Sequence, residues 1–166
     1  MEHVLALLTP ANALVMRVIL HTGMRISDVL ELKTEQLKPS GWYTEKKTGK
    51  RRRYGLPGPL LEELKAQAGS VWAFEGRRGP QTHRTRQSVW ADVKRAQKAL
   101  RMPYNVGTHT ARKVYAVDLM ARYGDIDRVR RALNHNSVSV TTIYAMADLL
   151  LQRKLAARAR ARGKRA

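Results

Sequence analysis

The sequence predicts a mainly helical fold with a small antiparallel β-sheet (α+β). Apolar residues recur at helical spacing through most of the chain, and one stretch places aromatic residues on both sides of a turn at Thr48 and Gly49. The length of 166 residues suits one domain, and a hydrophobic content of 43% is sufficient for a packed core. We therefore expect one compact domain that ends in a basic tail.

The first half of the chain is expected to hold three helices and a β-hairpin. Apolar residues follow Pro10 at helical spacing, and Gly23 ends that pattern. Aromatic residues flank the Thr48 and Gly49 turn, which predicts the hairpin. The expected helices cover residues 11–21, 25–32 and 58–67, and a third short strand is expected over residues 71–74.

The second half of the chain is expected to be helical after a loop over residues 76–80. Its clearest element is an amphipathic helix over residues 82–100, whose apolar stripe consists of Val89, Val93, Ala96 and Leu100. Pro103 interrupts the chain before the next helix. Further helices are expected over residues 108–122, 125–133 and 138–146.

The charge of the chain points to a polyanionic partner. There are 32 Lys and Arg residues against 13 Asp and Glu, which gives a formal charge of +19 and a pI of about 11.1. Nucleic acid is the commonest partner of such a protein, and charge alone does not separate DNA from RNA. The absence of cysteine excludes disulfides and thiolate chemistry. No signal sequence or membrane-length apolar run is seen, so we expect a soluble, cytoplasmic protein without a membrane partner.

Several residues could carry chemistry on a DNA phosphate, which needs cations, a nucleophile and an acid. His109 and Arg112 share a helix face at i and i+3. Tyr144 lies in the last predicted short helix. A polar turn between His135 and Tyr144 could fold the histidine back toward the tyrosine. Each also has a plainer interpretation. His109 and Arg112 could be the basic start of a solvated helix, and Tyr144 could be a core residue. His135 could be part of a loop.

The hairpin turn and the start of the second helix add further candidates. The turn carries six cations within eight residues: Lys46, Lys47, Lys50, Arg51, Arg52 and Arg53. They form either a solvated loop that touches phosphate or a site with a proton-donating lysine. Arg25 lies just after the glycine break at Gly23, and Asp28 one turn later could orient it. The plainer interpretation of these two is a weak surface ion pair.

Taken together, the order and spacing of these residues resemble the catalytic domain of the tyrosine recombinases. Residues 21–32 (HTGMRISDVLEL) resemble the box of the first catalytic arginine, and residues 47–49 (KTG) resemble the turn of the catalytic lysine. Residues 109–112 (HTAR), 133–135 (LNH) and 141–144 (TTIY) resemble the later boxes. Asn134 departs from the usual glycine, and the histidine often found two positions after the tyrosine is absent.

The resemblance implies a site-specific recombinase that cleaves and rejoins double-stranded DNA through a 3′-phosphotyrosine. It implies the catalytic residues Arg25, Lys47, His109, Arg112, His135 and Tyr144, and neither a cofactor nor a metal. The residues expected to contact DNA are Lys46, Lys50, Arg51, Arg52, Arg84 and Arg86. The alternatives are a type IB topoisomerase-like enzyme and a non-catalytic DNA-binding regulator on the same fold.

The resemblance also implies how the chain is organised. We expect a catalytic domain over residues 1–147, without the N-terminal DNA-binding domain of the family, and a basic segment over residues 148–166. That segment either docks on a neighbouring protomer or only adds affinity for phosphate. A monomer is expected in free solution and a homotetramer on DNA.

Overall fold

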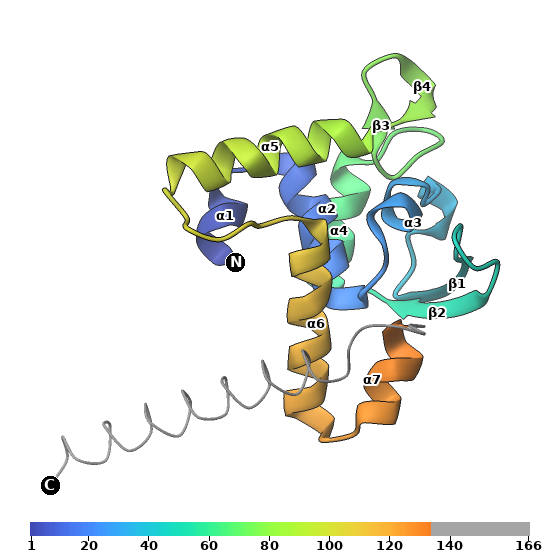
Figure 1. Cartoon of the computed structure of the whole chain (residues 1–166). Coiled ribbons are helices and arrows are strands. Elements are labelled where there is room, and N and C mark those ends of the chain that lie inside the picture. The colour runs from blue at the N-terminus through green and yellow to red at the C-terminus, as the bar shows by residue number, and fades with distance from the viewer. Residues whose placement is uncertain (134–166) are drawn as a thin grey trace, which may run out of the picture. The chain divides into compact units, whose positions relative to one another are not determined.

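The computed structural model describes residues 1–133, and the chain divides into two compact units at Arg112 (Figure 1). The first unit, Met1–Arg112, contains most of the elements. Its helices are α1 (Glu2–Ala6), α2 (Pro10–Thr22), α3 (Ile26–Leu30), the short 3₁₀ helix Thr34–Gln36, α4 (Gly58–Gln67) and α5 (Arg86–Ala99). Its strands are β1 (Ser40–Thr44), β2 (Arg51–Gly55), β3 (Glu75–Gly76) and β4 (Gly79–His83). The expected fold class, mainly helical with small antiparallel sheets, is confirmed.

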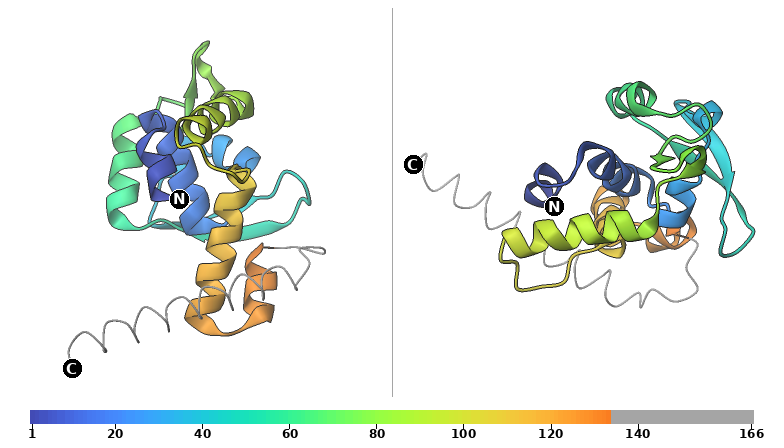
Figure 2. Two further views of the ribbon diagram at one scale, coloured as in Figure 1. Left: turned by 60° about the vertical axis from the view of Figure 1, so that its left-hand side comes forward. Right: turned by 90° about the horizontal axis from the view of Figure 1, so that it is seen from above.

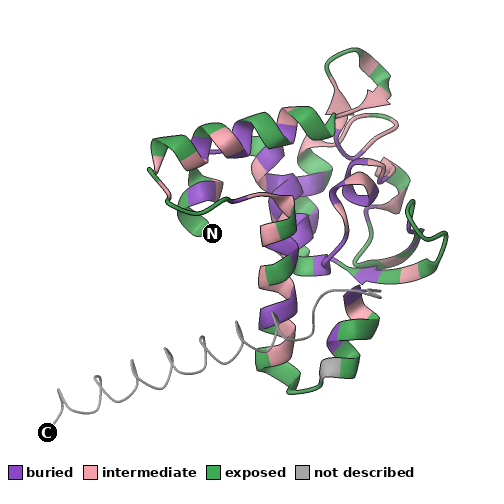
Figure 3. Cartoon of the chain, in the orientation of Figure 1, coloured by how far each residue is buried: buried purple, intermediate pink, exposed green. Residues whose placement is uncertain are grey.

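Helix α2 is the centre of the first unit, since α1, α3, α4 and α5 all contact it. Figure 2 shows α2 between α4 and α5 from two further directions. Val15, Met16, Val18 and Ile19 of α2 are fully buried, and Figure 3 shows the buried residues gathered along it. The apolar stripe of α5 packs into the same core through Val89, Val93 and Ala96, as its spacing predicts.

The predicted hairpin is present as the antiparallel pair β1 and β2, with Trp42 opposite Arg53 and Tyr43 opposite Arg52. Alternate residues of a strand face opposite sides, and Tyr43 and Tyr54 occupy the buried side. Gly49 at the turn has a φ of 67°, a conformation in which glycine carries no steric penalty. The hairpin therefore fixes which of its cations face the core.

Three of the elements expected between residues 71 and 100 were wrong in type or bounds. Residues 71–74 are not a strand, apart from a single bridge between Lys33 and Trp72. The expected loop over residues 76–80 is instead the turn of a second hairpin, in which β3 pairs with β4. Because β4 runs to His83, α5 begins at Arg86 rather than at residue 82, with the Thr85 hydroxyl accepting from Ser88 N at 3.2 Å.

Helix α6 (Thr108–Tyr123) begins in the first unit, and α7 (Ile126–Leu133) belongs to the second, Lys113–Ala166. Within the second unit, Ala116 of α6 forms a small apolar cluster with Val129 and Leu133 of α7. Gly124 joins the two helices with a φ of 64°. The helix expected over residues 138–146 and the basic segment over residues 148–166 lie outside the described residues. Across residues 1–133, none of the helices is long and apolar enough to span a membrane.

Candidate functional site

Two candidate catalytic arginines lie at the corner between α2 and α3. Gly23 ends α2 with a φ of 65°, and Arg25 is the N-cap residue of α3 with an extended backbone. Arg112, on the first turns of α6, donates from Nη1 to the carbonyl oxygen of Gly23 at 2.6 Å. Arg112 is buried, whereas the Arg25 side chain is 14% exposed. The corner thus brings together two guanidinium groups that are 87 residues apart in sequence.

A buried carboxylate lies against this pair. Glu45 follows β1 directly, and its side chain is 0% exposed. Its Oε1 accepts a hydrogen bond from Arg52 Nη1 at 2.8 Å and lies 2.8 Å from Arg25 Nη1, a contact without hydrogen-bond geometry. Arg25 is therefore paired with Glu45, and the plainer interpretation of Arg25 and Asp28 as a surface ion pair is corrected, since Asp28 is buried and Arg25 largely so.

Asp28 has a different role. It is buried, and its Oδ1 accepts from the backbone N–H of Lys46 at 3.0 Å, which ties α3 to the hairpin. Burial, opposed by that hydrogen bond, raises the pKa of Asp28 above its usual value. The ionised form is destabilised by burial, so the cations nearby help to keep it charged.

The electrostatics of the corner are those of a crowded cationic site. Burial, and then the positive charges of Arg25 and Arg52, lower the pKa of Arg112 from 12.5 to about 10. Burial likewise raises the pKa of Tyr43 to about 12. Three guanidinium groups thus lie close enough to repel one another, against the two carboxylates of Glu45 and Asp28. An anion placed here would relieve this repulsion.

The candidate general acid Lys47 lies on the exposed turn between β1 and β2. The turn is closed by Glu45, whose carbonyl oxygen accepts from Gly49 N at 2.8 Å and whose Oε2 accepts from Thr48 Oγ1 at 2.7 Å. His109, the remaining described candidate, is exposed at the start of α6, three residues before Arg112. His135 and Tyr144 lie outside the described residues.

The residues expected to bind DNA divide into two groups. Lys46, Lys50, Arg51 and Arg86 are exposed, as a phosphate contact requires. Arg52, with a side chain 13% exposed, instead faces inward to Glu45. Arg84 is half-buried, and its Nη1 donates to Asn12 Oδ1 at 3.3 Å.

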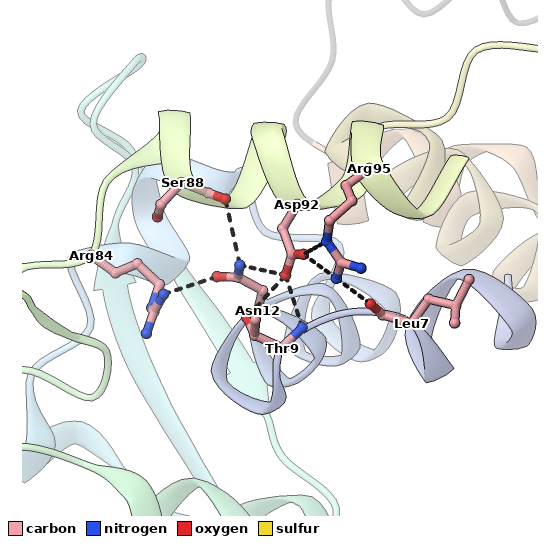
Figure 4. A network of polar contacts seen from close by, with 7 residues as sticks. All are labelled: Leu7, Thr9, Asn12, Arg84, Ser88, Asp92 and Arg95. Carbon is pink, nitrogen blue, oxygen red and sulfur yellow. Dashed lines mark hydrogen bonds and ion pairs between the residues drawn. The ribbon is translucent and has the colours of Figure 1, made fainter. Parts of the chain in front are cut away.

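Arg84 belongs to a polar network between the start of α2 and α5 (Figure 4). Asp92 is its centre: Oδ2 accepts from Thr9 N at 2.8 Å and Asn12 Nδ2 at 2.8 Å, and Oδ1 accepts from Arg95. Burial, and then the charge of Arg77, lower the pKa of Arg84. Arg84 therefore takes part in the packing of α5 in addition to any contact with a ligand.

Two hollows accompany these residues. The larger, about 1160 Å³, is lined by Arg77, Arg78, Arg84 and Arg95 but by none of the described candidate catalytic residues. The smaller, about 370 Å³, is lined by Ile26, Arg86, Trp90 and Thr108, among others. Ile26 and Thr108 are the chain neighbours of Arg25 and His109, so the smaller hollow is the one beside the candidate chemistry.

Sequence reasoning missed Glu45 and the inward orientation of Arg52. A signal was available in strand alternation, because Tyr43 and Glu45 share one face and Arg52 lies opposite Tyr43. A single acid ahead of a run of cations could have been recognised as the counter-ion of that face. The reason it was missed is that the run of charge resembled a fully solvated turn.

Comparisons with known proteins show which family the chain resembles. The model of the phage integrase family matches residues 4–149. The probable integrase/recombinase YoeC of Bacillus subtilis is 30% identical over 135 residues, covering 78% of this chain and 74% of YoeC. The tyrosine recombinase XerA of Pyrococcus furiosus is 30% identical over 142 residues, covering 80% of this chain and 49% of XerA.

Solved structures give the same fold. A crystal structure of XerA recombinase superposes with a TM-score of 0.71 at 16% identity, covering 95% of this chain and 60% of that one. XerH site-specific recombinase, in a pre-cleavage complex with difH substrate, superposes with a TM-score of 0.64 at 25% identity, covering 82% of this chain and 42% of that one. The chain thus spans about half the length of several relatives. On the family match over residues 4–149 and the identity with YoeC, the chain belongs to the phage integrase family of tyrosine recombinases.

Proposed function

We propose that this chain is the catalytic domain of a site-specific recombinase that cleaves and rejoins double-stranded DNA. The observation that carries the proposal is the corner at which Arg25 and Arg112 meet beside the Lys47 turn. A phosphodiester is a single negative charge, and this corner holds three guanidinium groups against two carboxylates. The XerH relative, solved on its difH substrate, supports DNA as the ligand.

In the proposed reaction, Tyr144 Oη attacks the scissile phosphorus and the bond from phosphorus to the 5′-oxygen breaks. Arg25 and Arg112 hold the non-bridging oxygens as negative charge develops on them. Lys47 gives its proton to the departing 5′-oxygen, and His109 assists the loss of the tyrosine proton. His135 hydrogen-bonds the phosphate. The product is a 3′-phosphotyrosine with a free 5′-hydroxyl, and rejoining reverses these steps.

The exposed cations extend the proposed contact with DNA away from the cleaved phosphate. Four exposed cations are accessible to the DNA backbone: Lys46, Lys50 and Arg51 on the hairpin, and Arg86 at the start of α5. Their contacts would release counter-ions, so affinity should fall steeply with salt. We also propose four copies on DNA and one in free solution, which light scattering with and without a duplex would test.

The role of Arg25 can be tested by removing either its own positive charge or the negative charge of the scissile phosphate. Arg25→Ala should slow cleavage of ordinary DNA by about 100-fold or more, the cost typical of losing a transition-state donor. A substrate with a methylphosphonate at the scissile position lacks the negative charge that Arg25 would neutralise. The variant should therefore cleave it at nearly the rate of the unaltered chain.

Arg17→Ala is the matched control, because Arg17 forms a surface ion pair with Glu63 on α4. It should leave cleavage of both substrates unchanged. If Arg25→Ala were equally impaired on ordinary and methylphosphonate DNA, charge neutralisation by Arg25 would be wrong.

A further inference from the structure

Glu45 contacts two different parts of the proposed catalytic site with its two carboxylate oxygens. Oε1 lies 2.8 Å from Nη1 of both Arg25 and Arg52. Oε2 accepts from Thr48 Oγ1 at 2.7 Å, and Thr48 is the residue next to Lys47. One side chain thus joins the arginine corner to the turn of the candidate proton donor.

The backbone of Glu45 holds the same turn. Its N–H donates to the carbonyl oxygen of Lys50 at 3.0 Å, and its own carbonyl oxygen accepts from Gly49 N at 2.8 Å and from Thr48 N at 3.3 Å. The turn is therefore anchored at Glu45 by main chain and side chain together. Lys47 itself is exposed, so its reach depends on how firmly the turn beneath it is held.

The burial of Glu45 restricts its carboxylate to the contacts described above. A carboxylate that is 0% exposed is stable only when it is paired and hydrogen-bonded. Arg52 supplies a hydrogen-bonded partner, which explains why this cation faces inward from the strand. Rotating Glu45 away would leave both arginines and the carboxylate without these contacts, so the present arrangement is strongly preferred.

We propose that Glu45 is a positioning residue that holds the Lys47 turn in register with Arg25, so that proton donor and phosphate-binding arginine reach the same phosphate. This inference rests on the proposed function. It predicts that loosening the Glu45 and Thr48 contact impairs mainly the step that Lys47 serves, protonation of the 5′-oxygen.

Two DNA substrates separate that step from the others. In ordinary DNA the leaving 5′-oxygen needs a proton, whereas in a 5′-bridging phosphorothiolate the leaving sulfur departs without one. Lys47→Ala is the benchmark and should be impaired on ordinary DNA only. The ratio of the two cleavage rates then reports how well Lys47 is placed.

Thr48→Val is the decisive variant, since valine keeps the shape of threonine but removes the hydroxyl that donates to Glu45. It should slow cleavage of ordinary DNA by about tenfold or more, as misplacement of a catalytic group does, and leave cleavage of the phosphorothiolate nearly unchanged. Thr48→Ser restores a hydroxyl and should restore the rate. Thr48 lies on an exposed turn, so these variants are expected to fold.

Glu45→Ala tests the other end of the contact and should change the rate ratio in the same direction. Unchanged ratios for Thr48→Val and Glu45→Ala, with normal cleavage by the unaltered chain, would overturn the positioning role alone. Absence of cleavage of either substrate by the unaltered chain would instead overturn the proposed function, and this inference with it.

Discussion

Asp92 is a buried carboxylate whose hydrogen bonds are expected to stabilise the fold, and Asp92→Asn tests this. The substitution keeps the shape of the side chain but replaces one acceptor oxygen with an N–H₂ donor. Oδ1 faces Arg95, and Oδ2 faces Thr9 and Asn12, all of which donate (Figure 4). In either orientation the new amide group must face a donor, so at least one hydrogen bond to Asp92 is lost.

The magnitude follows from the pKa of Asp92. Burial would raise it, but hydrogen bonds from Asn12, Thr9 and Arg95 outweigh burial and lower the pKa from 3.8 to about 2. At about 1.4 kcal/mol per pKa unit, ionised Asp92 stabilises the folded chain by about 2 to 3 kcal/mol at neutral pH. Because the pKa is lower in the folded than in the unfolded chain, this stability is present above about pH 4 and is lost as pH falls toward 2.

The assay is urea unfolding of the unaltered chain and of Asp92→Asn between pH 2 and pH 7. The variant should be less stable by about 2 to 3 kcal/mol at pH 7, and the difference should shrink as pH falls from 4 to 2. Glu62→Gln, which alters only the exposed pair with Lys65 on the same helix, is the control and should change the stability little. A difference in stability that is constant across this range would refute the assignment to ionised Asp92.

Substitutions at two glycines test backbone conformation. In thermal unfolding, Gly49→Ala should destabilise the chain by about 1 kcal/mol, because the φ of 67° strains any residue with a Cβ although no atom lies within 4 Å to clash. Gly49→Asn should destabilise the chain less in the same measurement. Equal losses of stability for the two variants would contradict a backbone origin. Gly58→Ala, on the first turn of α4 with open space around the new Cβ, should stabilise the chain by about 0.4 to 1 kcal/mol. A loss of stability would mean that the glycine is needed there for another reason.

The elements that the sequence predicted well are those with local signals. Helix α4 was predicted with its observed bounds, and α2 within one residue at each end, because Pro10 and Gly23 mark its limits. The β1 and β2 hairpin was predicted from its turn. For α5, both Thr82 and Thr85 are acceptable N-cap residues, and pairing of β4 with β3 in the hairpin just before α5 decides between them. A strand of two residues such as β3 is too short to leave an alternating pattern in the sequence.

The candidate site was predictable in its cations but not in its counter-ion. Arg25 and Arg112 were identified by resemblance, and their meeting at Gly23 is consistent with that prediction. The pairing of Arg25 with Glu45 rather than Asp28 depends on how the hairpin packs against α3. That packing brings together residues about 20 positions apart, which no helical or strand spacing encodes. The roles of His135 and Tyr144 remain predictions from the sequence.

The most direct test of the central claim is covalent trapping on nicked duplex DNA. The unaltered chain and Tyr144→Phe would be incubated with the same substrates, denatured, and separated on a gel that resolves protein joined to DNA. We predict an adduct with the unaltered chain and none with Tyr144→Phe, although both bind DNA in a salt-dependent way. An adduct of equal yield with Tyr144→Phe, or salt-dependent binding without any adduct from the unaltered chain, would contradict cleavage through Tyr144.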